Sequence, residues 1–434
     1  MSLYGGINIV GAPDLENVRR LDLLPMKAIA EMQRFGFPID KEHFRALSER
    51  LAEEMKELRY QICSFIPVEK LDEFIERSNL EADDEYLPMN VDSRVQIANL
   101  LFDILGIGRG KQLKRTKSGD QVSTGKRQME QLRREHEIVP LILQYREYAK
   151  LKGTYCDPLP EQAVLHPAGL CERCSLDDFA VVHDEPTLCV HTTILHTRTS
   201  TGRLSSKAPN LQNLPIRSDY GQQVRAGFVA PAGMELFGAD FSQLQLRFLA
   251  HSANEERIIG IFERGEDPHT MTAMWTFEKA KEEVESKEGK LMYRAPSKNV
   301  NFALAFGETP RGLYDQLVSD SYGKAGIEVP EWLTLEWCEG FFAKWHELYP
   351  SVGPYMEKQY YRARRYGVVW DMFGRVRRVP EVRSVHKRVV AAGLRQAGNH
   401  PIQAPDSGVM RLALAEVQAE VVEKVRAEGI RCWL

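Results

Sequence analysis

An acid at a strand end is the first feature of this chain that could do chemistry. Asp240 follows a short apolar run over residues 236–239 and precedes Phe241, where a strand would end and a helix begin. A carboxylate there can hold a divalent cation, which bridges a triphosphate and neutralises charge as a phosphoryl group moves. The alternative is structural, because Asp240 can also cap the helix that follows.

The second feature is a stripe of side chains that recur at every fourth position: Arg294, Lys298, Phe302 and Phe306. On a helix this stripe has two cations followed by two aromatic rings. It suits a nucleoside triphosphate whose phosphates lie at the cationic end and whose base stacks at the aromatic end. Pro296 is tolerated only in a first turn, which predicts that Arg294 lies at or just before the helix start. A core-facing stripe with two surface cations is the alternative.

The third feature is an amide-rich stretch over residues 199–215, with Arg203, Asn210, Gln212 and Asn213. Amides and an arginine can hydrogen-bond base edges in the minor groove, where acceptor positions vary little between base pairs. Such contacts suit an enzyme that checks the shape of a base pair without reading its sequence. The alternative is a turn-rich loop whose side chains satisfy its own backbone.

Helices are expected to position most of these groups. Apolar residues recur at helical spacing from residue 41 to 58, and helical patterns also cover residues 93–105, 127–152 and 267–366. Another runs from Val389 to Glu428 and is expected to break near residues 401–405, which contain two prolines. Strands are expected at residues 190–199, 236–240 and from 430 onwards, and residues 156–192 are expected to be irregular.

The composition is that of an ordinary globular protein. The chain has 434 residues, 43% hydrophobic and 27% charged, with a net charge of -4, and its length suggests about three domains. It has no apolar run long enough to span a membrane and no signal peptide at its start. Seven cysteines over such a length argue against a secreted disulfide framework, so we expect an intracellular protein, in a cell or in an infected host.

Three cysteines indicate a second metal site. Cys171 and Cys174 have ligand-type spacing, and Cys189 with His183 or His191 could complete a tetrahedral set for zinc. The alternative is a loop with free thiols.

These segments, taken in order, resemble family A DNA polymerases of the phage or bacterial type. Residues 240–247 resemble motif A, residues 294–307 motif B, and residues 199–215 the primer–template segment. Further matches lie at residues 268–273, 373–380 and 395–403, and the likeness extends over residues 20–434. The resemblance implies an α+β multidomain right-hand polymerase fold, with a helical thumb, an antiparallel-sheet palm and helical fingers. The boundaries expected from it are an upstream stub at 1–20, thumb at 21–192 with an insertion at 156–192, palm at 193–260, fingers at 261–392 and a return to the palm at 393–434.

The resemblance also implies a role for each matching residue. Asp240 and the Phe241 backbone carbonyl would bind two Mg²⁺ ions, and Lys298 would join Asp240 in catalysis of attack by a primer 3′-hydroxyl on a dNTP. The dNTP would contact Arg294, Lys298, Phe302, Phe306, Gln245, His269 and Gln243. Primer–template DNA would contact Arg203, Asn210, Gln212, Asn213, Asn301, Arg395, Asn399 and Gln403.

Three departures from the family pattern matter. Gln245 stands where the family usually has Glu, and Phe306 where it has Tyr, which leaves open a polymerase with relaxed sugar choice. The family's motif C, a His-Asp-Glu strand, is expected shortly after residue 434, so the polymerase region is expected to stop before it and to need a second polypeptide or further residues. A non-catalytic relative that binds primer–template DNA is the alternative. Residues 183–185 also read His-Asp-Glu, but they precede motif A and are interpreted as a chance match.

Overall fold

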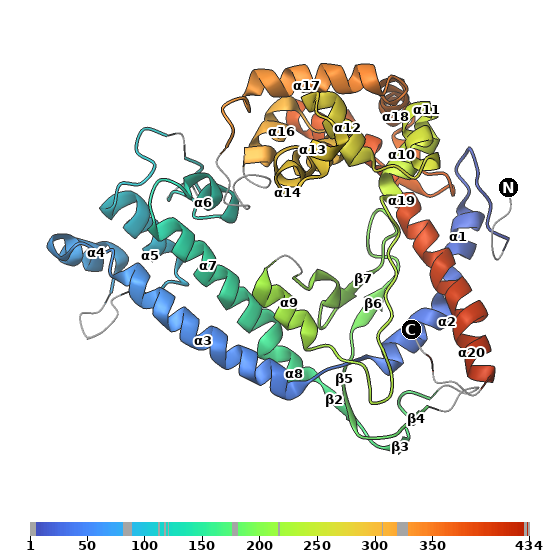
Figure 1. The fold of residues 1–434 in the computed structure, drawn as a ribbon, viewed down its shortest axis with the longest axis horizontal. Helices are drawn as coiled ribbons and strands as arrows, with labels where there is room; N and C mark the ends of the chain where they lie inside the picture. The colour runs from blue at the N-terminus through green and yellow to red at the C-terminus, as the bar shows by residue number, and fades with distance from the viewer. Residues whose placement is uncertain are drawn as a thin grey trace.

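The computed structural model describes residues 6–80, 89–111, 113–116, 119, 121–175, 181–215, 218–305, 307–318, 329–428 and 432. These residues form many helices and four small antiparallel sheets. The ribbon has an arm of helices around α3 and α7, a bundle of helices α10–α18, and a long helix α19 that descends from the bundle towards α2 (Figure 1). Within the described ranges, no helix is both long and apolar enough to cross a membrane.

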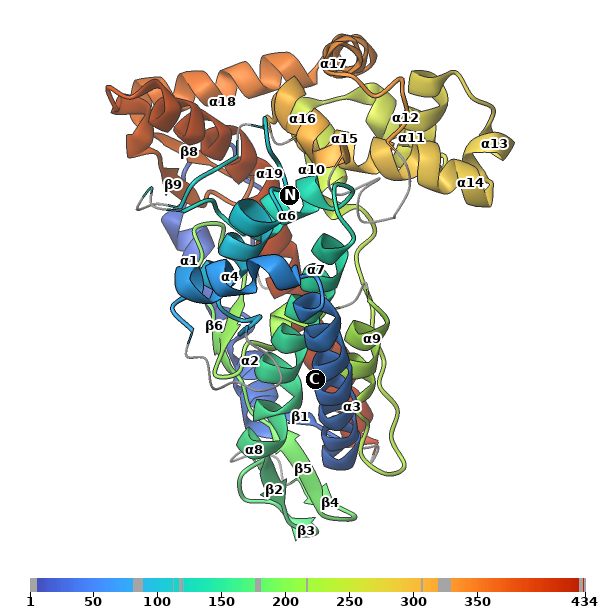
Figure 2. The ribbon, with the colours of Figure 1, turned by 90° about the vertical axis from the view of Figure 1, so that its left-hand side faces the viewer.

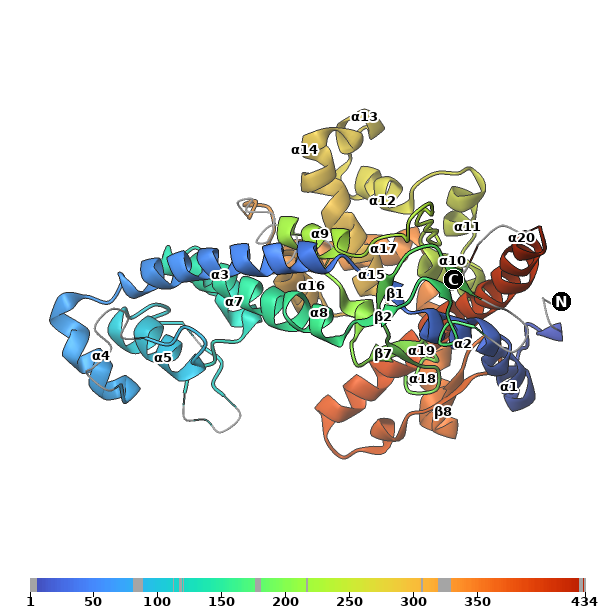
Figure 3. The same cartoon turned by 90° about the horizontal axis from the view of Figure 1, so that it is seen from below.

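Helix α3 (Lys41–Cys63) is the spine of the arm. Asp40 caps its first turn by accepting a hydrogen bond from the His43 amide. Phe44 and Leu47 are fully buried, and α3 packs along α7, as the view from below also shows (Figure 3). The helix predicted at this position is therefore confirmed. The other helices of the arm are α4 (Leu71–Ser78), α5 (Arg94–Ala98), α6 (Lys126–Leu132), α7 (Ile138–Leu151), α8 (Pro158–Gln162) and α9 (Asp219–Ala226).

Residues 156–175 and 181–192 contain short paired strands, contrary to the irregular structure that the sequence predicted for 156–192. Strand β5 (Thr187–Val190) pairs with β1 (Phe37–Pro38) on one side and β2 (Val164–His166) on the other, and β3 (Gly169–Leu170) pairs with β4 (Val182–His183). These strands are too short to produce an alternating pattern, which is why the sequence did not predict them. The strand expected at 190–199 is divided, because β6 (Thr193–Leu195) pairs instead with β7 (Ser205–Lys207).

The bundle has its own hydrophobic core. Phe341, Trp345 and Tyr349 are buried at its centre, and in the side view the bundle lies above α3 and α7 (Figure 2). The predominantly helical character predicted for residues 267–366 is confirmed. The helices are α10 (Leu244–Ala253), α11 (Glu256–Glu263), α12 (Pro268–Phe277), α13 (Lys281–Glu285), α14 (Lys287–Gly289), α15 (Ala295–Ala305), α16 (Pro310–Gln316), α17 (Leu335–Leu348) and α18 (Val352–Tyr366).

Helix α19 (Lys387–Val417) runs unbroken through Pro401 and Pro405, where the sequence predicted an interruption. Each proline removes one backbone donor, but the two lie four residues apart, so both losses fall on one face of the helix. Ile402 and Ala404 are fully buried between them, and this packing outweighs the local cost. Around and beyond α19 lie α1 (Leu15–Leu23), α2 (Met26–Phe35), β8 (Val368–Trp370), β9 (Val376–Arg378) and α20 (Glu423–Ala427). The strand expected from residue 430 lies outside the described residues, Cys432 excepted.

Candidate functional site

The cationic half of the predicted stripe begins where the sequence placed it. Helix α15 starts at Ala295, directly after a π-helical turn (Lys290–Arg294), and Pro296 lies in its first turn. Arg294 is half-buried and Lys298 is exposed. The Phe302 side chain and Phe306 lie outside the described residues, so the aromatic half of the stripe stays a prediction.

Asp267, which the sequence analysis did not single out, organises this cationic end. It caps α12 by accepting hydrogen bonds from the Thr270 amide and hydroxyl. It also accepts hydrogen bonds from Gln243 Nε2 and Arg294 Nε, each at 2.7 Å. Burial raises the pKa of the Asp267 carboxyl, but these donors outweigh burial and lower that pKa to about 2. One carboxylate therefore positions two of the predicted nucleotide contacts. Its sequence signal was an acid directly before Pro268, a common helix start.

His269 and Asn301 face each other inside the bundle. Each side chain is only 2% exposed, and Asn301 Nδ2 lies 3.1 Å from His269 Nδ1. Asn301 Oδ1 also accepts a hydrogen bond from Trp345 Nε1 at 3.0 Å. The amide of Asn301 is thus used within the protein, and the DNA contact predicted for it does not fit this structure. Burial lowers the pKa of His269 to about 4, so the ring is neutral at pH 7, and the predicted phosphate contact requires the ring to become exposed.

Gln245 and Arg203 meet at Asp406 on α19. Gln245 Nε2 donates a hydrogen bond to Asp406 Oδ2 at 2.7 Å, and the Arg203 guanidinium forms an ion pair with the same oxygen. The sequence analysis assigned Gln245 to the nucleotide and Arg203 to DNA, and it did not single out Asp406. A glutamate at position 245 would face Asp406 with like charge, whereas the amide of Gln245 can donate. Asp406 therefore gives a physical reason for glutamine at this position.

A row on α19 carries three further predicted DNA contacts. Arg395, Asn399 and Gln403 are four residues apart, so they share one face of the helix. Arg395 is exposed and the other two are half-buried. A cavity of about 470 Å³ between α15 and α19 is lined by Ala303, Arg395 and Asn399, among others. This cavity joins the predicted nucleotide helix to the predicted DNA contacts.

The turn that carries Arg203 is held from behind by a buried arginine. Arg411 is fully buried and donates hydrogen bonds to the main-chain oxygens of Gly202, at 2.8 Å, and of His196. Its Nε lies 3.3 Å from Asp22 Oδ1. Gly202 has φ of 78°, and a Cβ there would lie 2.7 Å from the guanidinium carbon of Arg375. Glycine therefore suits this position, because it adopts a positive φ without strain and leaves room for the Arg375 guanidinium.

The amides after this turn are exposed. Asn210, Gln212 and Asn213 all face solvent. Asn210 Oδ1 also accepts hydrogen bonds from the Gln212 amide, at 3.1 Å, and from the Ser206 hydroxyl, at 3.0 Å. The loop therefore satisfies part of its own backbone, as the structural alternative predicted, and it still presents three amides to the outside.

The segment that carries Asp240 lacks the predicted strand. Residues 235–241 have no regular structure, and no strand within the described ranges pairs with them. Leu236 and Phe237 are 57% and 95% exposed, and Asp240 is exposed as well. An isolated strand leaves its amides and carbonyls unpaired, so this apolar run does not form one alone. The chain then enters α10 through Gln243, whose φ of 53° is left-handed.

Comparison with known proteins gives these features a family. The model of DNA polymerase family A matches residues 41–431. The chain belongs to DNA polymerase family A. It is 34% identical over 394 residues to the thermostable DNA polymerase I of Thermus aquaticus, covering 91% of this chain and 40% of that protein. It is 32% identical over 409 residues to DNA polymerase I of Caldicellulosiruptor bescii, covering 94% and 40%. The chain thus spans about two fifths of the length of these curated relatives.

A solved family A structure confirms the predicted α+β polymerase fold. The POL domain of Pol1 from M. smegmatis, in complex with DNA primer-template and dNTP, superposes with a TM-score of 0.72 at 25% identity. The match covers 96% of this chain and 63% of that one. The assignments of motif A to residues 240–247 and of motif B to residues 294–307 stay predictions.

The predicted zinc ligands lie at the other end of the molecule from motif B (Figure 1). Cys171, Cys174 and His183 do come together, but the fourth member of the group is His166, which the sequence analysis missed. Cys189 is buried nearby and does not belong to the group. The Cys189 prediction was drawn from spacing alone, and spacing does not show which way a strand residue points.

Proposed function

We propose that this chain carries out the nucleotide-selecting part of template-directed DNA synthesis. In this reaction the primer 3′-hydroxyl attacks the α-phosphate of a dNTP and pyrophosphate leaves. The observation that carries the proposal is the cavity between α15 and α19, which is lined by Ala303 of α15 and by Arg395 and Asn399 of α19. The solved relative, titled as a complex with primer-template and dNTP, supports these ligands.

Each half of the site has a proposed task. Arg294 and Lys298 hold the triphosphate by charge-assisted hydrogen bonds, so phosphate competes with Asp267 for Arg294. Gln245, held by Asp406, lies beside the sugar. The exposed Arg203 and Arg395 line the primer and template together with the amide side chains of Asn210, Gln212, Asn213, Asn399 and Gln403. Residues 21–192 serve as thumb, 193–260 with 393–434 as palm, and 261–392 as fingers.

Asp240 and the Phe241 carbonyl are the residues proposed to hold Mg²⁺. The Asp240 carboxylate is exposed, and no hydrogen bond or ion pair to it is found among the described residues, so it is available to a cation. Bound Mg²⁺ would activate the 3′-hydroxyl and neutralise the leaving pyrophosphate. One carboxylate is too few for the two-ion geometry, so the reaction needs a second acid close to Asp240.

We infer that this second acid arrives on a strand that pairs with residues 236–240. The exposed Leu236 and Phe237 and the unpaired backbone around them are what such a strand would cover. A second polypeptide or further residues of the same protein could supply it. The competing function is primer–template binding without synthesis.

A nucleotide-selection experiment separates the two functions without requiring catalysis. The chain is bound to a primer–template whose primer ends in a dideoxynucleotide, and DNA affinity is measured with each of the four dNTPs. With a polymerase site, DNA affinity increases only in the presence of the dNTP that matches the template base, and Lys298→Ala removes this increase. Equal affinity with all four dNTPs would support a simple DNA-binding role.

A further inference from the structure

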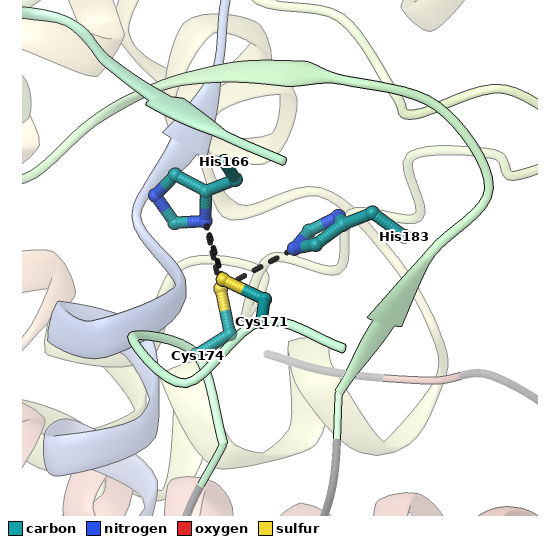
Figure 4. A group of neighbouring side chains, drawn as sticks. All are labelled: His166, Cys171, Cys174 and His183. Carbon is teal, nitrogen blue, oxygen red and sulfur yellow. Dashed lines mark hydrogen bonds between the residues drawn. The ribbon is translucent and has the colours of Figure 1, made fainter. Parts of the chain in front are cut away.

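Four buried side chains converge beneath the sheet that contains β5, far from motif B (Figure 4). His166 ends β2, Cys171 follows β3, Cys174 lies in the turn after it, and His183 ends β4. One ligand atom from each lies within 4.8 Å of the other three. Figure 4 shows both sulfur atoms turned towards the two imidazole rings.

The distances suit a tetrahedral metal ion. Ligand atoms at about 2.3 Å (sulfur) and 2.0–2.1 Å (nitrogen) from zinc lie roughly 3.5 Å apart. Here Cys171 Sγ lies 3.6 Å from His166 Nδ1, and Cys174 Sγ lies 3.4 Å from His183 Nε2. His166 Nδ1 is closer to Cys174 Sγ, at 2.8 Å, so that one edge must lengthen when a metal binds.

A chain of hydrogen bonds turns the metal-binding nitrogen of His166 towards the cysteines. The Gln33 main-chain oxygen can only accept, so His191 Nδ1, 2.9 Å away, donates to it. His191 Nε2 then accepts from His166 Nε2, also 2.9 Å away. His166 is left with an unprotonated Nδ1 that faces Cys174. A metal-bound histidine typically donates its other ring N–H to such a partner.

This part of the fold has little else to stabilise it. The apolar cluster around the site has only Phe35, Cys171, Cys174 and Val181 as its buried members within the described ranges. Strands β3 and β4 have two residues each, and small loop-rich units of this kind usually need a cross-link. A Cys₂His₂ set is a preferred ligand set for structural zinc.

We propose that His166, Cys171, Cys174 and His183 form a structural zinc site that fastens residues 164–190 to the end of α2. Gln33, at that end, also accepts a hydrogen bond from the Ile194 amide through Oε1 at 2.7 Å. Since Ile194 lies in β6, the site also supports the hairpin next to the Arg203 turn. The site takes no part in the proposed nucleotidyl transfer, so either proposal can fail without the other.

The first test is metal content by elemental analysis of the purified full chain. We expect one zinc per chain in the wild type and in Cys189→Ser and Cys156→Ser, which change buried cysteines outside the group. Cys171→Ser and His166→Asn should lose the metal. A zinc content that is lost in Cys189→Ser and kept in His166→Asn would overturn the ligand set. A Cys171–Cys174 disulfide in metal-free native protein would overturn the site.

A second measurement uses only the wild-type chain, so it does not depend on whether the variants fold. The wild-type chain is stripped with a chelator, and its Tm is followed as Zn²⁺ or Mg²⁺ is added back. A metal ion that binds the folded state and not the unfolded state stabilises the protein. We therefore expect Zn²⁺ to raise Tm by about 5 °C or more and Mg²⁺ to leave it unchanged. Cobalt(II) in the same protein should give the visible absorption of a tetrahedral thiolate site. Unchanged Tm with Zn²⁺ and an octahedral cobalt spectrum would each contradict the proposal.

Discussion

The motif B end and the motif A end of the proposed site differ in how many of their contacts the described chain supplies. At the motif B end, Asp267 holds Arg294 and Gln243 at 2.7 Å each, and Asp406 holds Gln245. At the motif A end, Asp240 lies on an exposed apolar run that pairs with no described strand. Under the proposed function, the side chains expected to hold a nucleotide are already positioned by partners within this chain, whereas metal binding requires a neighbour for that run.

The largest expected effect concerns the support behind the DNA-facing turn. Arg411→Ala should lower the free energy of unfolding by about 3 kcal/mol or more, because it leaves the Gly202 and His196 carbonyls unsatisfied and removes one of the two arginines that pair with Asp22. Urea unfolding measures the loss. Arg388→Ala, an exposed arginine of the same helix, should change stability by less than about 0.5 kcal/mol. Similar losses in both variants would show that the turn is not held as described.

The second effect tests the proposed role of Lys298 at the motif B end. In an active polymerase that contains this chain, Lys298→Ala should lower kcat/KM for the dNTP by about 10²-fold or more, as expected for the loss of one preorganised charge contact. DNA affinity should hardly change. Lys287→Ala, another exposed lysine of the bundle, serves as the matched control. A collapse of DNA binding in Lys298→Ala would place this lysine on the template path instead.

The third effect is a pH dependence of stability that His269, near the motif B end, confers on the protein. Its pKa falls from 6.5 to about 4 on folding because the ring is buried. As pH falls below 6.5 the unfolded state takes up a proton first, so stability is lost between pH 6.5 and 4. Between pH 7.5 and 5.5 the wild type should lose about 1 kcal/mol more than His269→Asn. Urea unfolding at both pH values measures this, and equal losses would mean that the ring titrates normally.

The smallest effect concerns sugar choice. Gln245→Glu alone should bring two carboxylates together and disturb the Asp406 contact. In an Asp406→Asn background that repulsion is absent. There, Gln245→Glu should improve discrimination against ribonucleotides by roughly 2- to 12-fold, the value of one neutral hydrogen bond. The ratio of kcat/KM values for deoxy- and ribonucleotides is the readout. No gain in that background would leave only a steric role for this side chain.

Local signals predicted the parts of the fold that depend on local structure. The apolar spacing over residues 41–58 predicted α3, and Pro296 predicted the start of α15. Asp406 could not be found this way, because it meets Gln245 from 161 residues away. The prediction of a strand at residues 236–240 failed for a related reason, because a strand forms only where another strand pairs with it. The His166 ligand was missed because β2 and β4 belong to different small sheets, and sequence spacing does not show that these two sheets meet.

Primer extension with Mg²⁺ tests the central claim most directly. The chain of residues 1–434 is compared with the same chain supplied with a strand that carries an acid and can pair beside residues 236–240. We expect both to bind primer–template, and the chain alone to extend at least about 10²-fold more slowly, since several kcal/mol of charge stabilisation is missing. Asp240→Ala should abolish extension in the completed enzyme. Fast extension by the chain alone, lost in Asp240→Ala, would contradict the account.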